Sequence, residues 1–146
     1  MKRALLLVIA VGALGIAGAT VASGQATTAA GKRPLLISNC AKPKFKPANV
    51  ILACGDASFG ATGMSWSSWT RKAAVGTGTG QINDCKPDCA HGHQKSAPIQ
   101  LRLKKPVTCK NGRRIFAKVR YTWTQGAPQN FPDSGGVPLG CKLLGL

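Results

Sequence analysis

The sequence predicts a small all-β domain, a disulfide-stapled antiparallel sandwich or partly open barrel of roughly six strands. Two observations lead to this fold class. Apolar and polar residues alternate over two neighbouring segments that an Asn-Gly pair separates, and six cysteines follow an apolar leader in a chain of 146 residues. Alternation is typical of strands with one buried face, and small exported domains with many cysteines are commonly cross-linked.

Residues 1–30 are expected to be a signal peptide and a small-residue spacer. A basic start precedes an apolar run from Ala4 to Ala19, and small residues follow it. This is the pattern of a secretory signal peptide and not of a membrane span. We therefore expect a secreted protein that is extracellular or associated with the cell wall.

Residues 31–49 are expected to form a basic arm. From Ala41 to Asn49 lysine alternates with proline and phenylalanine, and proline lacks an amide donor and favours extended backbone. We interpret residues 41–49 as solvated, either a linker or a basic tether for an anionic wall or membrane surface. Residues 50–146 are expected to form a single β domain that ends in an irregular C-terminal tail.

Three segments with strand character follow the arm. NVILACG, residues 49–55, is a compact apolar run suited to a buried strand. In GMSWSSW, residues 63–69, a strand would put Trp66 and Trp69 on opposite faces, one in the core and one nearer the surface. In AAVGTGTGQI, residues 73–82, the glycines indicate a strand that another backbone approaches closely. Their spacing does not match a nucleotide-binding loop.

The most regular pattern lies in residues 99–104 and 114–123. IQLRLK and RIFAKVRYTW alternate apolar with polar side chains, which predicts two half-buried antiparallel strands. Asn111 and Gly112 lie between them, and this dipeptide is the favoured pair for a two-residue type I′ turn. The two segments are therefore expected to form a hairpin.

The register of this hairpin follows from which side chains must be buried. A two-residue turn alone would place the apolar Leu103 on the same face as Arg120. One extra residue in the first strand would bring the apolar side chains of both strands to the same face. We expect it at Lys105-Pro106, because proline interrupts the ladder and tolerates a bulge. Leu103 then pairs with Val119, and the apolar rows of both strands share one face.

The same register opposes two pairs of like charges on the outer face. Arg102 would face Arg120, and Lys104 would face Lys118. Like charges directly opposite each other are mildly unfavourable, so this patch needs water, salt or an anion to screen it. The expected anion contacts are Arg102, Lys104, Arg114, Lys118 and Arg120, around the aromatic side chain of Phe116. An exposed sheet face with solvated side chains is the alternative.

The net charge indicates the same class of partner. The chain has 20 Lys plus Arg against 4 acidic residues, a formal charge of +16. Such a surface attracts polyanions over about one Debye length and loses that attraction in salt. A high charge can also serve solubility alone, so the partner remains a hypothesis.

All six cysteines follow the leader, and an even number in an exported chain favours three disulfides. We expect three pairs: Cys40 with Cys141, Cys54 with Cys109, and Cys85 with Cys89. The first pair would tie down both tails of the domain.

The stretch NDCKPDCAHGH, residues 83–93, contains both histidines and two of the cysteines. A zinc site is one alternative, but structural sites commonly use two separated knuckles, and exported thiols tend to oxidise. Cysteine catalysis would need a free thiol, which the even count argues against. We therefore expect a disulfide-closed loop whose turns are shaped by Asp84, Pro87 and Asp88. We assign no catalytic residue, no metal ligand and no cofactor.

The motifs ILACGD, WSSW, GTGTGQINDCKPDCAHG and FAKVRYTW follow one another between Ile51 and Trp123. Together they resemble small secreted actinobacterial proteins of unknown function, and the string from Cys85 to Gly92 is the most specific part. The resemblance implies export from a Gram-positive cell and a shared small fold. It implies no activity.

The sequence thus favours a secreted, non-enzymatic, cationic binding protein whose partner is an anionic polymer of the cell envelope or extracellular space, or a membrane surface. Sequence-specific binding of nucleic acid is not expected. One alternative is a secreted hydrolase that uses Asp56 or Asp84 with His91 or His93. Another is a cationic, membrane-active protein of antimicrobial type.

Overall fold

The computed structural model describes residues 32–128 and 130–145. Its elements are β1 (Leu36–Ile37), β2 (Pro43–Lys44), β3 (Val50–Ile51), β4 (Phe59–Trp69), β5 (Ala74–Asn83), β6 (Gln94–Thr108), β7 (Arg114–Trp123), β8 (Ser134–Pro138) and the 3-10 turn η1 (Cys141–Leu144). The expected signal peptide lies outside the described residues. Within the described ranges, no helix is both long and apolar enough to cross a membrane.

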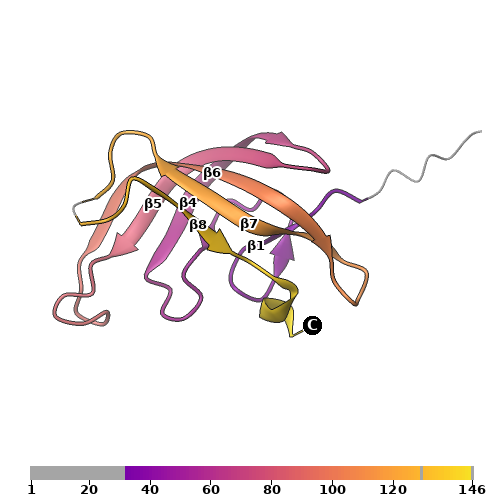
Figure 1. Cartoon of the computed structure of the whole chain (residues 1–146). Helices are drawn as coiled ribbons and strands as arrows, with labels where there is room; N and C mark the ends of the chain where they lie inside the picture. Colours follow the sequence, from indigo (N-terminus) through magenta and orange to yellow (C-terminus); the bar gives the residue numbers. More distant parts are fainter. Residues whose placement is uncertain (1–31, 129, 146) are drawn as a thin grey trace, which may run out of the picture. The chain divides into compact units, whose positions relative to one another are not determined.

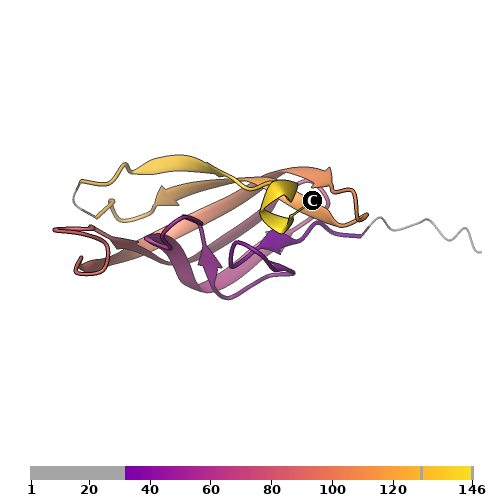
Figure 2. The ribbon, with the colours of Figure 1, turned by 90° about the horizontal axis from the view of Figure 1, so that it is seen from below.

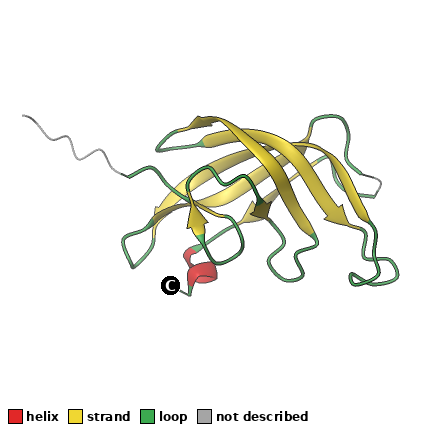
Figure 3. Cartoon of the chain, turned by 180° about the vertical axis from the view of Figure 1, so that it is seen from behind, coloured by secondary structure: helices red, strands yellow, loops and turns green. Residues whose placement is uncertain are grey.

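Strands β3 to β8 form one six-stranded antiparallel sheet in which each strand pairs with the next along the chain. Strands β1 and β2 form a separate two-stranded sheet. The large sheet curls into a half-barrel that stays open along one side (Figures 1 and 3). This confirms the antiparallel all-β fold and identifies it as the partly open barrel.

The inner face of the sheet holds the core. On β6 and β7 the predicted alternation is confirmed, because Leu101 and Leu103 are buried beside Tyr121 and Val119. Burying one large apolar side chain contributes about 1.5–3 kcal/mol. These rows therefore determine which side chains of both strands point outward.

The glycines of β5 make room for large side chains on the inner face. A Cβ atom at Gly76 would lie 2.6 Å from the Trp66 ring, and one at Gly78 would lie 2.7 Å from the Met64 sulfur. A Cβ atom at Gly80 would overlap the Trp123 ring. The predicted strand is confirmed, and side chains of neighbouring strands, in addition to backbone, make the close approach.

Trp66 and Trp69 lie on the same face of β4, so the expectation of opposite faces is wrong. The β4–β5 ladder shifts between Trp66 and Ser68, and a shift by one residue moves the following side chains to the other face. The two rings meet edge to face with their centroids 4.8 Å apart. Trp69 is buried and Trp66 is half-buried. One tryptophan is therefore in the core and the other nearer the surface, as expected.

The N-terminal segment is attached to the sheet, although most of residues 41–49 are exposed, as expected for a solvated arm. Leu36 and Ile37 are fully buried, and two tryptophan indoles of β4 donate hydrogen bonds to carbonyl oxygens of the segment, at Pro34 and Pro47. The apolar residues before Cys40 thus pack against the sheet, while the lysines of the segment stay exposed.

The predicted register of the β6–β7 hairpin is confirmed, with Leu103 opposite Val119. The turn is different from the expected two-residue type. The Cys109 amide donates to the Arg113 carbonyl at 2.8 Å, which closes a three-residue loop ending at Gly112, where φ is 75°. A glycine with positive φ is typical of the last position of such loops. The extra residue that brings the apolar side chains of both strands to one face therefore lies in the turn and not at Lys105-Pro106.

Lys105 nevertheless interrupts the ladder, without changing the register on either side. Its φ is 52°, and no pairing joins it to Ala117. Beyond this point Phe116 is turned inward and is 0% exposed, with its ring 5.6 Å from that of Trp69. Ile115 is buried on the other side, in a second cluster with Ile37.

The C-terminal tail is not irregular, because Ser134–Pro138 forms the edge strand β8 and η1 follows it. Gly135 on β8 lies directly against the Tyr121 side chain. A small residue here lets the edge strand close over the core, which the glycine-rich sequence of the tail did not suggest.

Two of the three expected disulfides are wrong. Cys85–Cys89 is confirmed, but the other pairs are Cys40–Cys54 and Cys109–Cys141. Because the N-terminal segment folds back along β3, Cys40 meets Cys54 with a Cα–Cα distance of 5.4 Å. The turn η1 lies at the same end of the sheet as the β6–β7 turn (Figure 2), and Cys141 meets Cys109 there.

Candidate functional site

Four cations lie together on the outer face of β6 and β7, and we call this group the cationic sheet face: Arg102, Lys104, Lys118 and Arg120. Arg102 pairs directly with Arg120, and Lys104 pairs with Lys118, as predicted. The residues next to them along each strand are mostly buried in the core. The four cationic side chains therefore point away from the core.

The edge strand beside this group carries small side chains. Gly136 on β8 lies opposite Arg120, and Pro138 lies opposite Lys118. A Cβ atom at Gly136 would lie 3.4 Å from Cε of Lys118, so the lysine stem extends across this glycine. Lys118 is consequently half-buried, whereas the other three cations are exposed.

Within the described part of the chain, no carboxylate pairs with the cationic sheet face. The ion pairs found there join Asp84 to His93 and Lys95, and Asp88 to His91. Each opposed like-charge pair on a sheet is destabilising by about a few tenths of a kcal/mol. An external anion is the group that would compensate this surface.

The four aspartates gather in loops at one end of the sheet. Asp56 precedes β4, Asp84 and Asp88 follow β5, and Asp133 precedes β8. The two longest of these loops form the left-hand end of the molecule in Figure 1. The turns at the opposite end are basic, with Arg71, Lys72, Lys110 and Arg113. Acidic charge is thus kept away from the cationic sheet face.

Two residues predicted for this surface are not part of it. Phe116 is in the core for the reason given above. Arg114 lies beyond the interruption at Lys105, next to the N-terminal segment, where Leu35 donates a hydrogen bond to its carbonyl oxygen. The exposed large apolar side chains of the described residues are Phe45 and Val107, so the cationic sheet face itself presents no aromatic ring.

Asp84 organises the loop between β5 and β6. Its Oδ1 accepts hydrogen bonds from the amides of His93 at 2.8 Å and Lys86 at 3.2 Å, and its Oδ2 lies 3.4 Å from Lys95 Nζ. The hydrogen bond from the His93 amide is the main cause that holds the pKa of Asp84 below its ordinary value of 3.8. The carboxylate is therefore ionised and committed to holding the loop.

Asp88 and His91 form a second contact in this loop, with His91 Nδ1 2.9 Å from Asp88 Oδ2. This contact, together with the His91 amide, lowers the pKa of Asp88. The side chains of His91 and His93 are 74% and 77% exposed. Lowered pKa values make these aspartates poor proton donors, and nothing excludes water from the imidazoles. The geometry therefore does not favour the hydrolase alternative.

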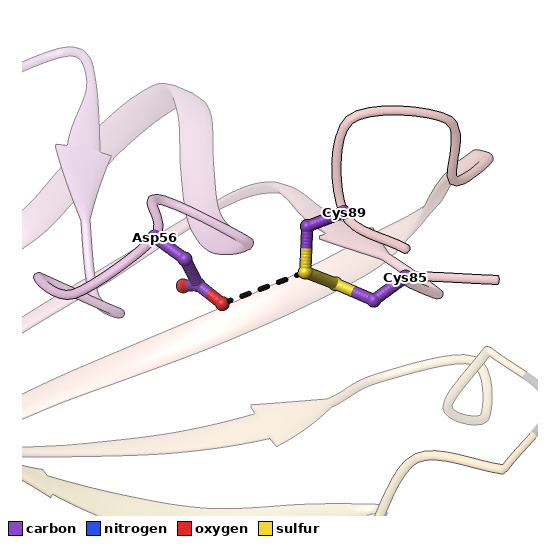
Figure 4. A group of neighbouring side chains, drawn as sticks. All are labelled: Asp56, Cys85 and Cys89. Carbon is purple, nitrogen blue, oxygen red and sulfur yellow. Dashed lines mark hydrogen bonds between the residues drawn. A yellow bond between two sulfur atoms is a disulfide. The ribbon is translucent and has the colours of Figure 1, made fainter. Parts of the chain in front are cut away.

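Asp56, Cys85 and Cys89 are the one trio of potential metal ligands found among the described residues, with ligand atoms within 4.8 Å of one another. The two sulfurs form a disulfide, and Asp56 Oδ2 lies 3.8 Å from Cys89 Sγ (Figure 4). A cysteine binds zinc as a thiolate, so the disulfide leaves Asp56 as the single available ligand of this trio. Asp56 also accepts a hydrogen bond from the Ser58 amide, which lowers its pKa.

A cavity of about 350 Å³ lies beside this loop, lined by Ser58, Ile82, Asn83, Asp84, Lys86, Lys95, Asn130 and Phe131. Its lining combines one carboxylate with two lysines, and one of these lysines already pairs with that carboxylate. The cavity therefore has little uncompensated charge compared with the cationic sheet face.

Comparison with protein-family models, with curated proteins and with solved structures found no match. The resemblance to small actinobacterial proteins stays a prediction. The three disulfides are of a kind that forms and persists in oxidising surroundings such as the cell exterior.

Proposed function

We propose that this protein is a secreted, non-enzymatic binding protein whose cationic sheet face holds an anionic polymer of the cell envelope or extracellular space. The observation that supports this most directly is the double opposition of Arg102 to Arg120 and of Lys104 to Lys118, in cations that take part in none of the ion pairs of residues 32–128 and 130–145.

The geometry suits a polymer with repeated charges. Neighbouring strands lie about 4.8 Å apart, and alternate residues on one strand are separated by about 7 Å. The four cations therefore form a small rectangle, so one anionic chain crossing it would contact several cations in turn. Each contact would release counterions and remove part of the repulsion within the like-charge pairs.

Phosphate or carboxylate groups are the expected recognition elements, because arginine forks bind both in bidentate fashion. Stacking of nucleic-acid bases needs aromatic platforms, and the burial of Phe116 withdraws the ring expected at this surface. A polymer recognised through its backbone charges is therefore favoured over single-stranded nucleic acid recognised through its bases.

The test is retention on purified cell wall over a range of salt concentrations. The variant replaces Arg102, Lys104, Lys118 and Arg120 by Ser. A control replaces four exposed lysines elsewhere, Lys42, Lys44, Lys46 and Lys86, by Ser, so that both proteins lose the same charge. We expect the sheet variant to lose retention, with the salt slope of log K reduced by about 3, and the control to keep most of it.

Equal retention by both variants would overturn the proposal, because net charge alone would then explain binding. Release of dye from anionic vesicles, together with weak retention on cell wall, would favour the membrane-active alternative instead.

A further inference from the structure

A basic groove lies at the end of the β6–β7 hairpin, separate from the cationic sheet face. Its volume is about 320 Å³, and its lining residues are Lys32, Arg33, Leu35, Asn111, Gly112, Arg113 and Arg114. We propose that this groove, called the hairpin groove below, binds a phosphoryl group of a phosphate ester or diphosphate. This second site does not depend on polymer binding by the cationic sheet face.

Backbone pairing builds one wall of the hairpin groove. Leu35 lies in a parallel bridge with Ile115. Its amide donates to the Arg114 carbonyl at 2.9 Å, and its carbonyl accepts from the Phe116 amide at 2.9 Å. The residues just before Leu35 are thereby held beside the hairpin, so cations from two distant parts of the chain converge.

The turn of the hairpin forms the other wall. The Arg113 amide donates to Asn111 Oδ1 at 3.1 Å, which engages the oxygen of that side chain and leaves its NH₂ group as a donor. Gly112 has a φ of 75°, and no atom lies within 4 Å of where its Cβ would be. The turn is therefore held in one shape, while its surface at Gly112 stays open.

The charge of the groove is uncompensated. Four of its seven lining residues are Lys or Arg, and none is acidic. The ion pairs found in the described ranges involve none of these four cations. Bringing four like charges together is unfavourable unless an anion is bound between them.

A phosphoryl group fits this arrangement better than a carboxylate does. Its oxygens are arranged tetrahedrally, so donors on both walls can bind it at once, whereas a carboxylate offers two oxygens in one plane. Arg33 and Arg113 can each bind it through a planar fork. The volume lies near the lower end of small-ligand sites, about 300–1,000 Å³, which leaves room for a second phosphoryl group or a sugar.

The test is titration of the oxidised protein with inorganic pyrophosphate at constant ionic strength, with calorimetry as the readout. The variant Arg33→Gln/Arg113→Gln alters two exposed side chains of the hairpin groove. The matched control Lys42→Gln/Lys44→Gln removes the same charge from two exposed side chains that belong neither to the hairpin groove nor to the cationic sheet face. We expect the first variant to weaken binding at least about tenfold, because charge-assisted hydrogen bonds are lost, and the control to bind as the unchanged protein does.

Equal weakening in both variants, or none in the first, would overturn the hairpin groove as the site. Binding of acetate as tight as that of pyrophosphate would overturn the choice of a phosphoryl group. Retention of all three proteins on cell wall is measured in parallel. A protein that binds pyrophosphate in the groove but is not retained would remove the polymer proposal and leave this one standing.

Discussion

The indole nitrogen of Trp69 donates a hydrogen bond to the carbonyl oxygen of Pro34 at 2.8 Å, and both groups are buried. Trp66, three residues earlier, donates in the same way to Pro47 at 2.9 Å, in a partly buried position. The two indoles thus fasten the N-terminal segment to the sheet at both ends. This attachment also holds Lys32 and Arg33 beside the hairpin.

Trp69→Phe is expected to lower the free energy of unfolding by about 1–3 kcal/mol, because the Pro34 carbonyl would be left buried without a donor. Urea denaturation followed by circular dichroism measures this change. The matched control is Trp66→Phe, which removes a hydrogen bond that is only partly buried, so a smaller loss is expected. A larger loss in the control would contradict the role given to the buried bond.

Gly80→Ala is expected to destabilise the fold by about 1–3 kcal/mol, because the added methyl group would overlap the Trp123 ring in a packed core. Gly140→Ala is the control, since its φ is −138° and no atom lies within 4 Å of its Cβ position. Thermal unfolding of both variants measures the difference. Equal melting temperatures would show that the core can relax around Gly80.

The like-charge pairs should be measurable as repulsion. A double-mutant cycle with Arg102→Gln and Arg120→Gln is expected to give an unfavourable coupling of about 0.2–0.5 kcal/mol at low salt. About 1 M salt should remove it, because the Debye length then falls to about 3 Å. A favourable coupling at low salt would mean that the two guanidinium groups already share an anion or stack.

Acid should loosen the β5–β6 loop through Asp84. Its pKa in the folded protein lies below 3.8, chiefly because of the hydrogen bond from the His93 amide. The stabilisation from this carboxylate is therefore complete above the ordinary pKa of 3.8 and is lost as the pH falls through the lower pKa of the folded protein. The chemical shift of the His93 amide proton, followed by NMR below about pH 4, should report the transition.

Asp84→Asn should abolish this acid transition, whereas Asp133→Asn, in the β7–β8 loop, should leave it in place. A His93 amide that titrates identically in the Asp84→Asn protein would show that another group controls the loop.

The alternating hairpin was predictable because one face must be apolar. With the turn at Asn111-Gly112, one extra residue brought Leu103 and Val119 to the same buried face, and the resulting register also opposed Arg102 to Arg120. The pairing of the four cations therefore followed from packing, before any functional consideration.

Features set by local backbone changes or by distant segments were not predictable. Phe116 is buried where the ladder is interrupted at Lys105, and the shared face of the tryptophans follows a ladder shift in β4. The hairpin groove needs the segment around Leu35 to pair with β7. The basic runs GKR and KNGRR were visible in the sequence, but nothing in the pattern indicated that they meet.

The disulfides pair the cysteines in chain order, the first with the second, the third with the fourth and the fifth with the sixth: Cys40–Cys54, Cys85–Cys89 and Cys109–Cys141. A chain that emerges N-terminus first into an oxidising compartment presents its cysteines in this order. Each thiol therefore meets its native partner before any later cysteine has appeared. In such a chain, oxidation during emergence would favour the correct cross-links, whereas refolding of the complete reduced chain must choose among all pairings.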